Sequence, residues 1–321
     1  MDKKQRKVVI VGDGSVGSSF AFSLVQNCAL DELVIVDLVK THAEGDVKDL
    51  EDVAAFTNAT NIHTGEYADA RDADIVVITA GVPRKPGESR LDLINRNTKI
   101  LESIVKPVVA SGFNGCFVIS SNPVDILTSM TQRLSGFPRH RVIGTGTSLD
   151  TARLRVALAQ KLNVATTAVD AAVLGEHGDS SIVNFDEIMI NAQPLKTVTT
   201  VDDQFKAEIE QAVRGKGGQI ISQKGATFYG VAVSLMQICR AILNDENAEL
   251  IVSAALSGQY GINDLYLGSP AIINRNGLQK VIEAELSDDE RARMQHFAAK
   301  MLTMMNVASI KMMSKYEEEL R

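Results

Sequence analysis

The chain has 321 residues, 45% of them hydrophobic and 23% charged, and its formal net charge is −7 at pH 7. This composition is typical of a folded globular protein and excludes gross disorder. The excess of acidic residues argues against a nucleic-acid-binding protein, which needs a basic surface. No apolar run approaches the roughly 18 residues of a membrane span, and the apolar stretch after the basic start is too short for a signal peptide.

Cysteines are few and widely spaced, at Cys28, Cys116 and Cys239. An odd number without a CxxC pair argues against a disulfide framework and fits a reducing compartment. Their apolar surroundings predict buried thiols. We therefore expect a cytoplasmic protein without membrane contact.

Short β-branched runs alternate with stretches of helical periodicity through the first half of the chain. The expected strands are Lys7–Val11, Leu33–Val36, Asp74–Thr79, Cys116–Ser120 and Arg141–Ile143. Expected helices between them include Ser15–Ala29 and Leu91–Ser111. This alternation is typical of an α/β domain, with a doubly wound parallel sheet and helices on both faces.

The alternation stops near residue 146, which we take as a boundary between a first domain of residues 1–146 and a second of residues 147–321. A helix is expected over Leu149–Leu162, a strand over the apolar run Ala168–Leu174, weaker strands around Ile182–Gln193, and mostly helix thereafter. Methionines at helical spacing from Met294 to Met313 predict a C-terminal helix that faces the core. The second domain is thus expected to be α+β.

A glycine-rich turn, Gly12-Asp13-Gly14-Ser15-Val16-Gly17, directly follows the first expected strand and opens a helix. Gly12 permits a tight turn, Gly14 lets the backbone approach a pyrophosphate, and Gly17 allows the helix to pack closely. Asp37 ends the next strand, where it would accept hydrogen bonds from ribose hydroxyls and repel a 2′-phosphate. These features predict a Rossmann domain that binds NAD rather than NADP. The alternative is a glycine turn without a ligand.

One of the five histidines, His177, stands in a charged cluster flanked by glycines, Gly175-Glu176-His177-Gly178-Asp179, after an expected strand. α/β enzymes place working residues at such strand ends. Asp150 and Arg153 lie three residues apart, on one face of the first turn of an expected helix. A dinucleotide domain implies hydride transfer, which requires a proton partner, so His177 is the candidate acid and base.

Two further motifs complete a pattern that covers essentially the whole chain: Gly87-Glu88-Ser89-Arg90 and Ser121-Asn122-Pro123-Val124-Asp125. Together with the glycine turn and the His177 cluster, they resemble the NAD-dependent L-lactate/L-malate dehydrogenase family. The resemblance implies an oxidoreductase that moves hydride between NAD and a small 2-oxo or 2-hydroxy acid, as a homotetramer or at least a dimer. The histidines have no metal-ligand spacing and the cysteines do not cluster, so no metal ion is expected.

The resemblance also implies a role for each motif residue. His177 matches the proton donor and acceptor, and Asp150 matches the carboxylate that orients its imidazole. Arg153 matches the residue that grips the substrate carboxylate. Arg90 matches a loop arginine that polarises the carbonyl, and Asn122 matches a residue that hydrogen-bonds the substrate.

Further residues fall where family members line the two ligand sites. Thr227 corresponds to a threonine of the substrate pocket. The expected cofactor-binding residues are Gly12, Gly14, Val16, Gly17, Asp37, Tyr67, Gly81, Val82, Ser120, Asn122 and Thr145.

The choice of substrate depends on Arg84, six residues before Arg90, where lactate dehydrogenases of the family usually carry Gln and malate dehydrogenases carry Arg. A guanidinium that closes over pyruvate's methyl group would be a buried charge without a partner, at a cost of roughly 3–5 kcal/mol. Arg84 therefore predicts a malate dehydrogenase on a lactate-type scaffold. Glu88 and Thr227 are lactate-type, so the alternatives are a lactate dehydrogenase, if Arg84 turns to solvent, or an enzyme for another 2-oxo acid.

Two other expectations concern regulation and loss of activity. Many bacterial members of the family bind fructose 1,6-bisphosphate through an Arg and a His, which here match Arg155 and Asp170. The aspartate would repel a phosphate, so strong activation by this sugar is not expected. A nucleotide-binding module that has lost its chemistry is a rival class, but His177, Asp150 and Arg153 are all retained, together with Arg90 and Asn122.

Overall fold

A computed structural model of the chain describes residues 6–83 and 87–319, with side chains as far as residue 307. The first half forms a six-stranded parallel sheet in the order β6-β5-β4-β1-β2-β3. Its strands are β1 (Lys7–Val11), β2 (Glu32–Val36), β3 (Asn61–Thr64), β4 (Ile75–Ile78), β5 (Cys116–Ile119) and β6 (Val142–Gly144). The five strands expected from the sequence are confirmed to within one residue at each end. Continuous burial of runs such as Val8–Val11 explains why they were recognisable.

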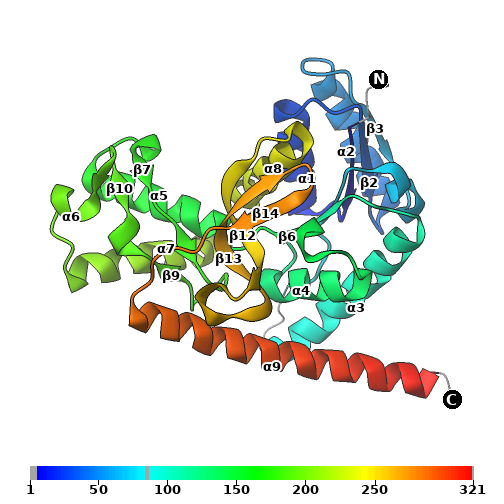
Figure 1. The fold of residues 1–321 in the computed structure, drawn as a ribbon. Helices are drawn as coiled ribbons and strands as arrows, with labels where there is room; N and C mark the ends of the chain where they lie inside the picture. The colour runs from blue at the N-terminus through cyan, green and yellow to red at the C-terminus, as the bar shows by residue number, and fades with distance from the viewer. Residues whose placement is uncertain (1–5, 84–86, 320–321) are drawn as a thin grey trace.

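Helices connect these strands and cover both faces of the sheet (Figure 1). They are α1 (Ser15–Asn27), α2 (Lys40–Ala54), α3 (Arg90–Ala110) and α4 (Val124–Ser135). The strand order reverses between β1 and β4, and a crevice for a dinucleotide lies at such a switch point, outside the carboxyl ends of the strands. The expected doubly wound Rossmann fold is confirmed.

Three antiparallel strands from the second half continue the same sheet beyond β6. They are β12 (Ala248–Ser257), β13 (Asn263–Asn274) and β14 (Gly277–Val281), and Ser253 of β12 pairs with Gly144 of β6. The expectation of mostly helix after Gln193 holds for that part of the chain as a whole but misses these three strands. The strands are rich in Ala, Ser, Gly and Asn, which have low strand propensity, and much of β12 and β13 is buried without a clear alternation of apolar and polar residues.

A smaller lobe, on the left in Figure 1, contains α5 (Ser148–Leu162) and short strands. These strands are β7 (Val169–Asp170), β8 (Val173–Leu174), β9 (Ile182–Val183), β10 (Met189–Ile190) and β11 (Gln193–Pro194). The single strand expected over Ala168–Leu174 is thus two strands, because β7 pairs with β10 while β8 pairs with β9 in a different sheet.

The remaining helices are α6 (Leu195–Val198), α7 (Asp203–Lys224), α8 (Tyr229–Asn244) and α9 (Asp288–Glu319). Single 3-10 turns occur at Tyr67–Asp72, Arg139–Arg141, Thr166–Ala168, Phe185–Glu187 and Gln259–Gly261. The predicted core-facing methionine helix is confirmed as far as residue 307, since Met294, Met301 and Met305 of α9 are buried, while Met312 and Met313 lie beyond the described side chains. The three cysteines are buried free thiols, as expected.

Two hydrophobic cores hold the chain together. The larger one surrounds the nine-stranded sheet and includes residues of α8 and α9, such as Leu235 and Met301. The smaller one joins α5 and α7 through residues such as Leu158 and Ile209. Because β12–β14 and α8 belong to the larger core, the division of the chain at residue 146 stays a prediction.

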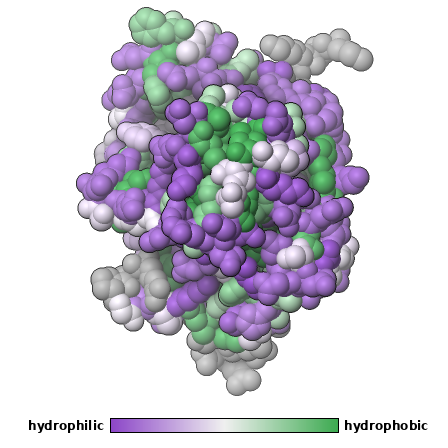
Figure 2. Space-filling model, turned by 90° about the vertical axis from the view of Figure 1, so that its left-hand side faces the viewer, coloured by the Kyte–Doolittle hydropathy of each residue, from purple (hydrophilic) through white to green (hydrophobic). Residues whose placement is uncertain are grey.

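The surface seen in Figure 2 has its apolar groups in separate patches between hydrophilic side chains. Within the described ranges, no individual helix is long and apolar enough to cross a bilayer. Only α7 and α8 taken together meet that length and composition test, and they are bent by 119°.

Candidate active site

The glycine turn after β1 has the shape that a pyrophosphate requires. Gly12 has a φ of +104°, and a Cβ there would lie 2.5 Å from the backbone nitrogen of Ala80. A Cβ at Gly17 would overlap the carbonyl oxygen of Gly12, so both positions exclude a side chain. By contrast, nothing lies within 4 Å of the Cβ position of Gly14. The open space over Gly14, at the start of α1, fits a phosphate group at the positive end of a helix.

Asp37 follows β2 beside this turn. Its Oδ2 accepts a hydrogen bond from the backbone N–H of Asp13 at 2.7 Å, and its Oδ1 accepts one from the N–H of Val39 at 2.8 Å. A cavity of about 280 Å³ adjoins it, lined by Asp37, Lys40, Glu66 and neighbouring residues. Half-buried Tyr67 begins the 3-10 turn that follows Glu66. A carboxylate held at the mouth of a cavity fits the ribose of a bound NAD.

The loops after β4 and β5 are joined by a buried asparagine of α3. The Asn97 side chain accepts a hydrogen bond from the N–H of Val82 at 2.9 Å and donates to the carbonyl oxygen of Asn122 at 2.6 Å. The structure therefore brings Val82 and Asn122 together. Gly81, Ser120 and Thr145 lie at the same edge of the sheet, after β4, β5 and β6. Asn97 was missed in the sequence, although a polar residue on the buried stripe of a helix was a usable signal.

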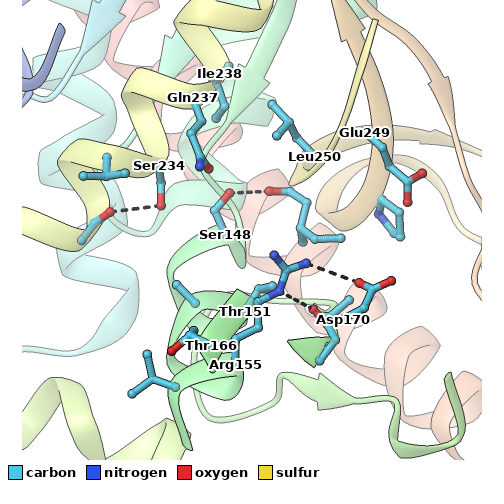
Figure 3. A pocket seen from close by; sticks show the side chains of 18 of the residues that line it. Ser148, Thr151, Arg155, Thr166, Asp170, Ser234, Gln237, Ile238, Glu249 and Leu250 are labelled. Atoms are coloured by element: carbon cyan, nitrogen blue, oxygen red, sulfur yellow. Dashed lines mark hydrogen bonds and ion pairs between the residues drawn. The ribbon is translucent and has the colours of Figure 1, made fainter. Parts of the chain in front are cut away.

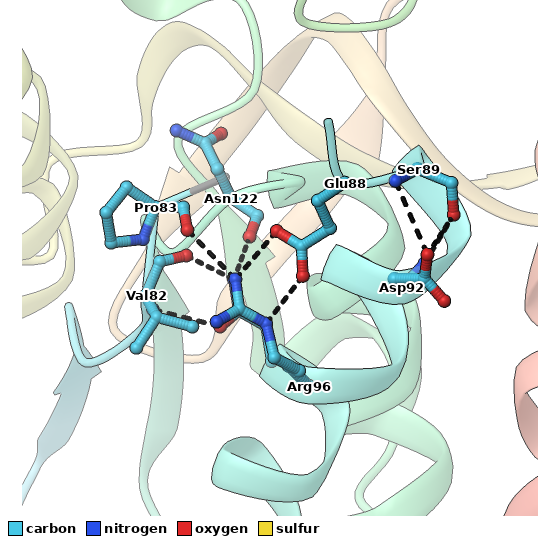
Figure 4. Close-up of polar contacts among 8 residues, drawn as sticks. Val82, Pro83, Glu88, Ser89, Asp92, Arg96 and Asn122 are labelled. Atoms are coloured by element: carbon cyan, nitrogen blue, oxygen red, sulfur yellow. Dashed lines mark hydrogen bonds and ion pairs between the residues drawn. The ribbon is translucent and has the colours of Figure 1, made fainter. Parts of the chain in front are cut away.

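The loop before α3 carries two of the residues that bear on substrate choice. Glu88 forms an ion pair with Arg96, with 2.8 Å between Oε1 and Nε, and Arg96 also donates to the carbonyl oxygen of Pro83 (Figure 4). Arg84 and Lys85 lie outside the described residues. The carboxylate of Glu88 is thus partly neutralised by a residue that the sequence did not single out.

His177, Asp150 and Arg153 form one cluster where the loop after β8 meets the first turns of α5. The His177 Nδ1 lies 2.5 Å from Asp150 Oδ2, and Arg153 Nη1 lies 3.3 Å from Asp150 Oδ1. Asp150 and Arg153 are buried, while about a quarter of the His177 side chain (27%) remains exposed. The geometry leaves the other imidazole nitrogen, Nε2, to exchange a proton with a substrate.

The surroundings of His177 favour its protonated form. Burial alone lowers the pKa of a histidine, but here it is opposed by the hydrogen bond and charge of Asp150 and by the charge of Asp125. The net effect is a pKa of His177 above its ordinary value of 6.5. A histidine with a raised pKa can hold a proton for a carbonyl oxygen near neutral pH.

Asp125 is a second buried carboxylate behind this cluster, and sequence reasoning gave it no role. It accepts hydrogen bonds from the backbone N–H of His177 at 2.9 Å and from the Ser253 hydroxyl at 2.5 Å. Burial raises the pKa of Asp125, against the effect of these two donors. Asp125 therefore fixes the His177 backbone to α4 and to β12. An aspartate between two apolar residues, Val124 and Ile126, in the first turn of a helix was the available signal.

Arg90 at the start of α3 is also brought to the site. Its guanidinium forms an ion pair with Glu176, the residue next to His177, and Glu176 in turn accepts a hydrogen bond from Ser180. Glu176 is buried, whereas Arg90 is half exposed. A cation is thus held one residue from the candidate acid, as a carbonyl-polarising group requires.

Thr227 has no described contact with the cluster of His177, Asp150 and Arg153. It lies in the connection between α7 and α8 and lines a cavity of about 310 Å³ with Lys224, Phe228 and Tyr229. In the parts of the chain that the structure describes, no hydrogen bond or ion pair joins Thr227 to His177. Its assignment to the substrate pocket stays a prediction.

Comparisons with known proteins agree with this geometry. The family model of the lactate/malate dehydrogenase NAD-binding domain matches residues 6–144, and the model of the family's alpha/beta C-terminal domain matches residues 147–311. L-lactate dehydrogenase 2 of Lactobacillus johnsonii is 59% identical over 92% of this chain and 96% of its own length. L-lactate dehydrogenase of Pediococcus acidilactici is 55% identical over 91% of both chains. The crystal structure of the minor L-lactate dehydrogenase from Enterococcus mundtii matches with a TM-score of 0.91, at 39% identity over 95% of this chain and 99% of that one.

These relatives overturn one expectation. Arg84 predicted a malate dehydrogenase, but chains that are 50–60% identical over nearly their whole length carry the name L-lactate dehydrogenase. The prediction of malate specificity is wrong. The physical reason is that a guanidinium that stays in water keeps its hydration, so an arginine in the sequence does not by itself require a second substrate carboxylate.

The glycine turn, the carboxylate beside it and the histidine–aspartate pair are found on a chain that two models of one family cover almost completely. The chain therefore belongs to the lactate/malate dehydrogenase family and is an enzyme that uses NAD.

Proposed function

We propose that the protein is an L-lactate dehydrogenase, which reduces pyruvate to L-lactate with NADH. The observation that carries the substrate class is the cluster of His177, Asp150 and Arg153, which combines a proton donor with a cation for a carboxylate. The choice of pyruvate is supported by relatives at 55–59% identity that are named L-lactate dehydrogenases.

Each side chain of the candidate site has a separate role in the proposed reaction. Arg153 binds the substrate carboxylate through its planar guanidinium. Asp150 holds Nδ1–H of His177, so that the protonated imidazole gives its Nε2 proton to the carbonyl oxygen. Arg90 and Asn122 stabilise the charge that develops on that oxygen. NADH, when bound, supplies the hydride that arrives at the carbonyl carbon.

A comparison of kcat/KM for pyruvate and for oxaloacetate, both with NADH, tests the proposed substrate. We expect pyruvate to be preferred, because relatives that are 55–59% identical over nearly their whole length are named L-lactate dehydrogenases. A preference for oxaloacetate would contradict the proposal while leaving the family membership untouched.

The pH dependence of pyruvate reduction should follow His177. Because its pKa is raised above 6.5 and the protonated form is the proton donor, kcat/KM for pyruvate should fall as the pH rises through that pKa. Lactate oxidation should show the opposite trend. Asp150→Asn removes the main cause of the raised pKa of His177, so the midpoint of the pH profile of kcat/KM should move to lower pH. Asp179 is exposed and lies two residues from His177, and Asp179→Asn should leave that midpoint unchanged. If the pH profiles of the wild type and Asp150→Asn coincide, Asp150 does not set the pKa of the proton donor and the proposed His177–Asp150 pair is contradicted.

Fructose 1,6-bisphosphate should not activate the enzyme. Arg155 and Asp170 line a cavity of about 630 Å³ (Figure 3). The Arg155 Nη2 lies 3.6 Å from Asp170 Oδ1, and the Arg155 Nε donates a hydrogen bond to the carbonyl oxygen of Ala171. The Arg155 guanidinium, which would have to bind a phosphate of the sugar, is already paired with the Asp170 carboxylate. A kinetic titration with the bisphosphate near neutral pH checks this, and clear activation would contradict it. Assembly as a homotetramer or dimer and a location in the cytoplasm stay predictions.

A further inference from the structure

Three side chains beside the glycine turn form a cluster that hydride transfer does not use. Asp13 belongs to the turn, and His42 and Asp46 lie one helical turn apart on α2. One ligand atom from each of the three lies within 4.8 Å of the other two. The His42 Nε2 is 3.6 Å from Asp46 Oδ2. We call these residues the turn–helix cluster.

Asp13 is the unusual member of the turn–helix cluster. It is 1% exposed, and neither of its carboxylate oxygens has a hydrogen-bond partner among the described residues. A buried carboxylate without a partner is strongly disfavoured. The backbone N–H of Asp13 donates to Asp37, whereas the group that faces the Asp13 carboxylate is another carboxylate, that of Asp46.

Most of the charged groups around Asp13 are negative. Asp37 and Asp46 add negative charge, and His42 opposes them only when it is protonated. Among the described residues, the three ligand atoms therefore converge where carboxylates outnumber cationic side chains.

We propose that Asp13, His42 and Asp46 bind a divalent metal cation. Two carboxylates and one imidazole form a mixed oxygen and nitrogen ligand set, which suits first-row divalent ions such as Mn²⁺. The ion would occupy the side of the turn that faces α2 and give the buried Asp13 carboxylate its missing partner. Exposed His42 and half-buried Asp46 leave an entry path from solvent.

The site is structural rather than catalytic. Its ion would connect the phosphate-binding turn to α2 and would reduce the repulsion between Asp13 and Asp37, the residue expected to bind the ribose. The proposal does not depend on which 2-oxo acid the enzyme reduces. Sequence reasoning missed the site because His42 and Asp46 find their third ligand 29 residues before His42, in a turn that was assigned to the cofactor alone.

Electron paramagnetic resonance of Mn²⁺ tests the proposal directly. The full-length protein, freed of metal with a chelator and without NADH, is titrated with MnCl₂, and the loss of the free-ion signal reports binding. We expect one saturable class of site per chain. His42→Gln and Asp46→Asn should each weaken binding by about tenfold or more, and Asp13→Asn should abolish it.

Two acidic residues on the same helix serve as matched controls. Glu44 and Asp49 are exposed on α2 outside the turn–helix cluster, so Glu44→Gln and Asp49→Asn should keep the wild-type affinity. His42 is more than half exposed, which makes His42→Gln safe for folding even if Asp13→Asn is not. The proposal fails if the wild type binds no Mn²⁺ up to about 1 mM, a very weak affinity. It also fails if His42→Gln binds as tightly as the wild type.

Discussion

His177→Asn should lower kcat for pyruvate reduction by about 10²- to 10⁴-fold, the range that general acid catalysis contributes. Asparagine fills similar space but cannot hold and release a proton near neutral pH. The hydrogen bond from the backbone N–H of residue 177 to Asp125 should survive, because it does not involve the side chain. Steady-state kinetics with pyruvate and NADH measures the loss.

A measurement of NADH binding distinguishes the loss of kcat in His177→Asn from misfolding of the variant. The glycine turn and Asp37 make no described contact with the His177 side chain, so a fluorescence titration with NADH should give nearly the wild-type affinity. His140→Asn replaces an exposed histidine in the 3-10 turn before β6 and should leave kcat unchanged. A rate near that of the wild type for His177→Asn would remove this residue from the mechanism.

The second large effect is expected for Arg153→Gln. Arg153 is buried against Asp150, and its loss removes the cation that binds the substrate carboxylate and leaves Asp150 without its ion pair. Truncating one partner of a buried charge pair costs about 2–5 kcal/mol, which corresponds to a decrease in kcat/KM of about 30-fold to 5,000-fold. Most of the change should appear in KM, because the carboxylate is bound in the ground state as well as in the transition state.

Arg155→Gln is the matched control for Arg153→Gln. Arg155 lies on the same helix, but it is more exposed and pairs with Asp170 instead. Its replacement should leave KM for pyruvate close to the wild-type value. Equal kinetic losses in the two variants would show a general effect on α5, and an unchanged KM in Arg153→Gln would exclude it as the carboxylate-binding residue.

The first half of the fold was predictable because its signals are local. β1, β4 and β5 are short runs of buried apolar residues, and each is recognisable from a few neighbouring positions. The glycine turn is recognisable locally too, from three glycines within six residues, although the clash that excludes a side chain at Gly12 is with Ala80, far along the chain. By contrast, β12 joins the sheet through Ser253 and Gly144, a pairing between distant parts of the chain.

The substrate prediction failed for a related reason. Arg84 was read as a single decisive residue, whereas specificity depends on how a loop meets the whole pocket. The Glu88 carboxylate, for example, forms an ion pair with Arg96 from the second turn of α3. Such a partner cannot be recognised from the loop sequence alone.

By itself, the sequence determined the Rossmann half and the use of NAD, and it named His177 and Asp150 as the candidate proton-exchanging pair. A glycine turn after a strand and a charged His motif carry their chemistry in consecutive residues. Only the tertiary structure decided that Ser253, 128 residues from Asp125, would complete the support of His177, and that Asp13 would meet His42 and Asp46. Contacts of this kind arise when distant elements pack together, and burial then makes every unpaired charge in them costly.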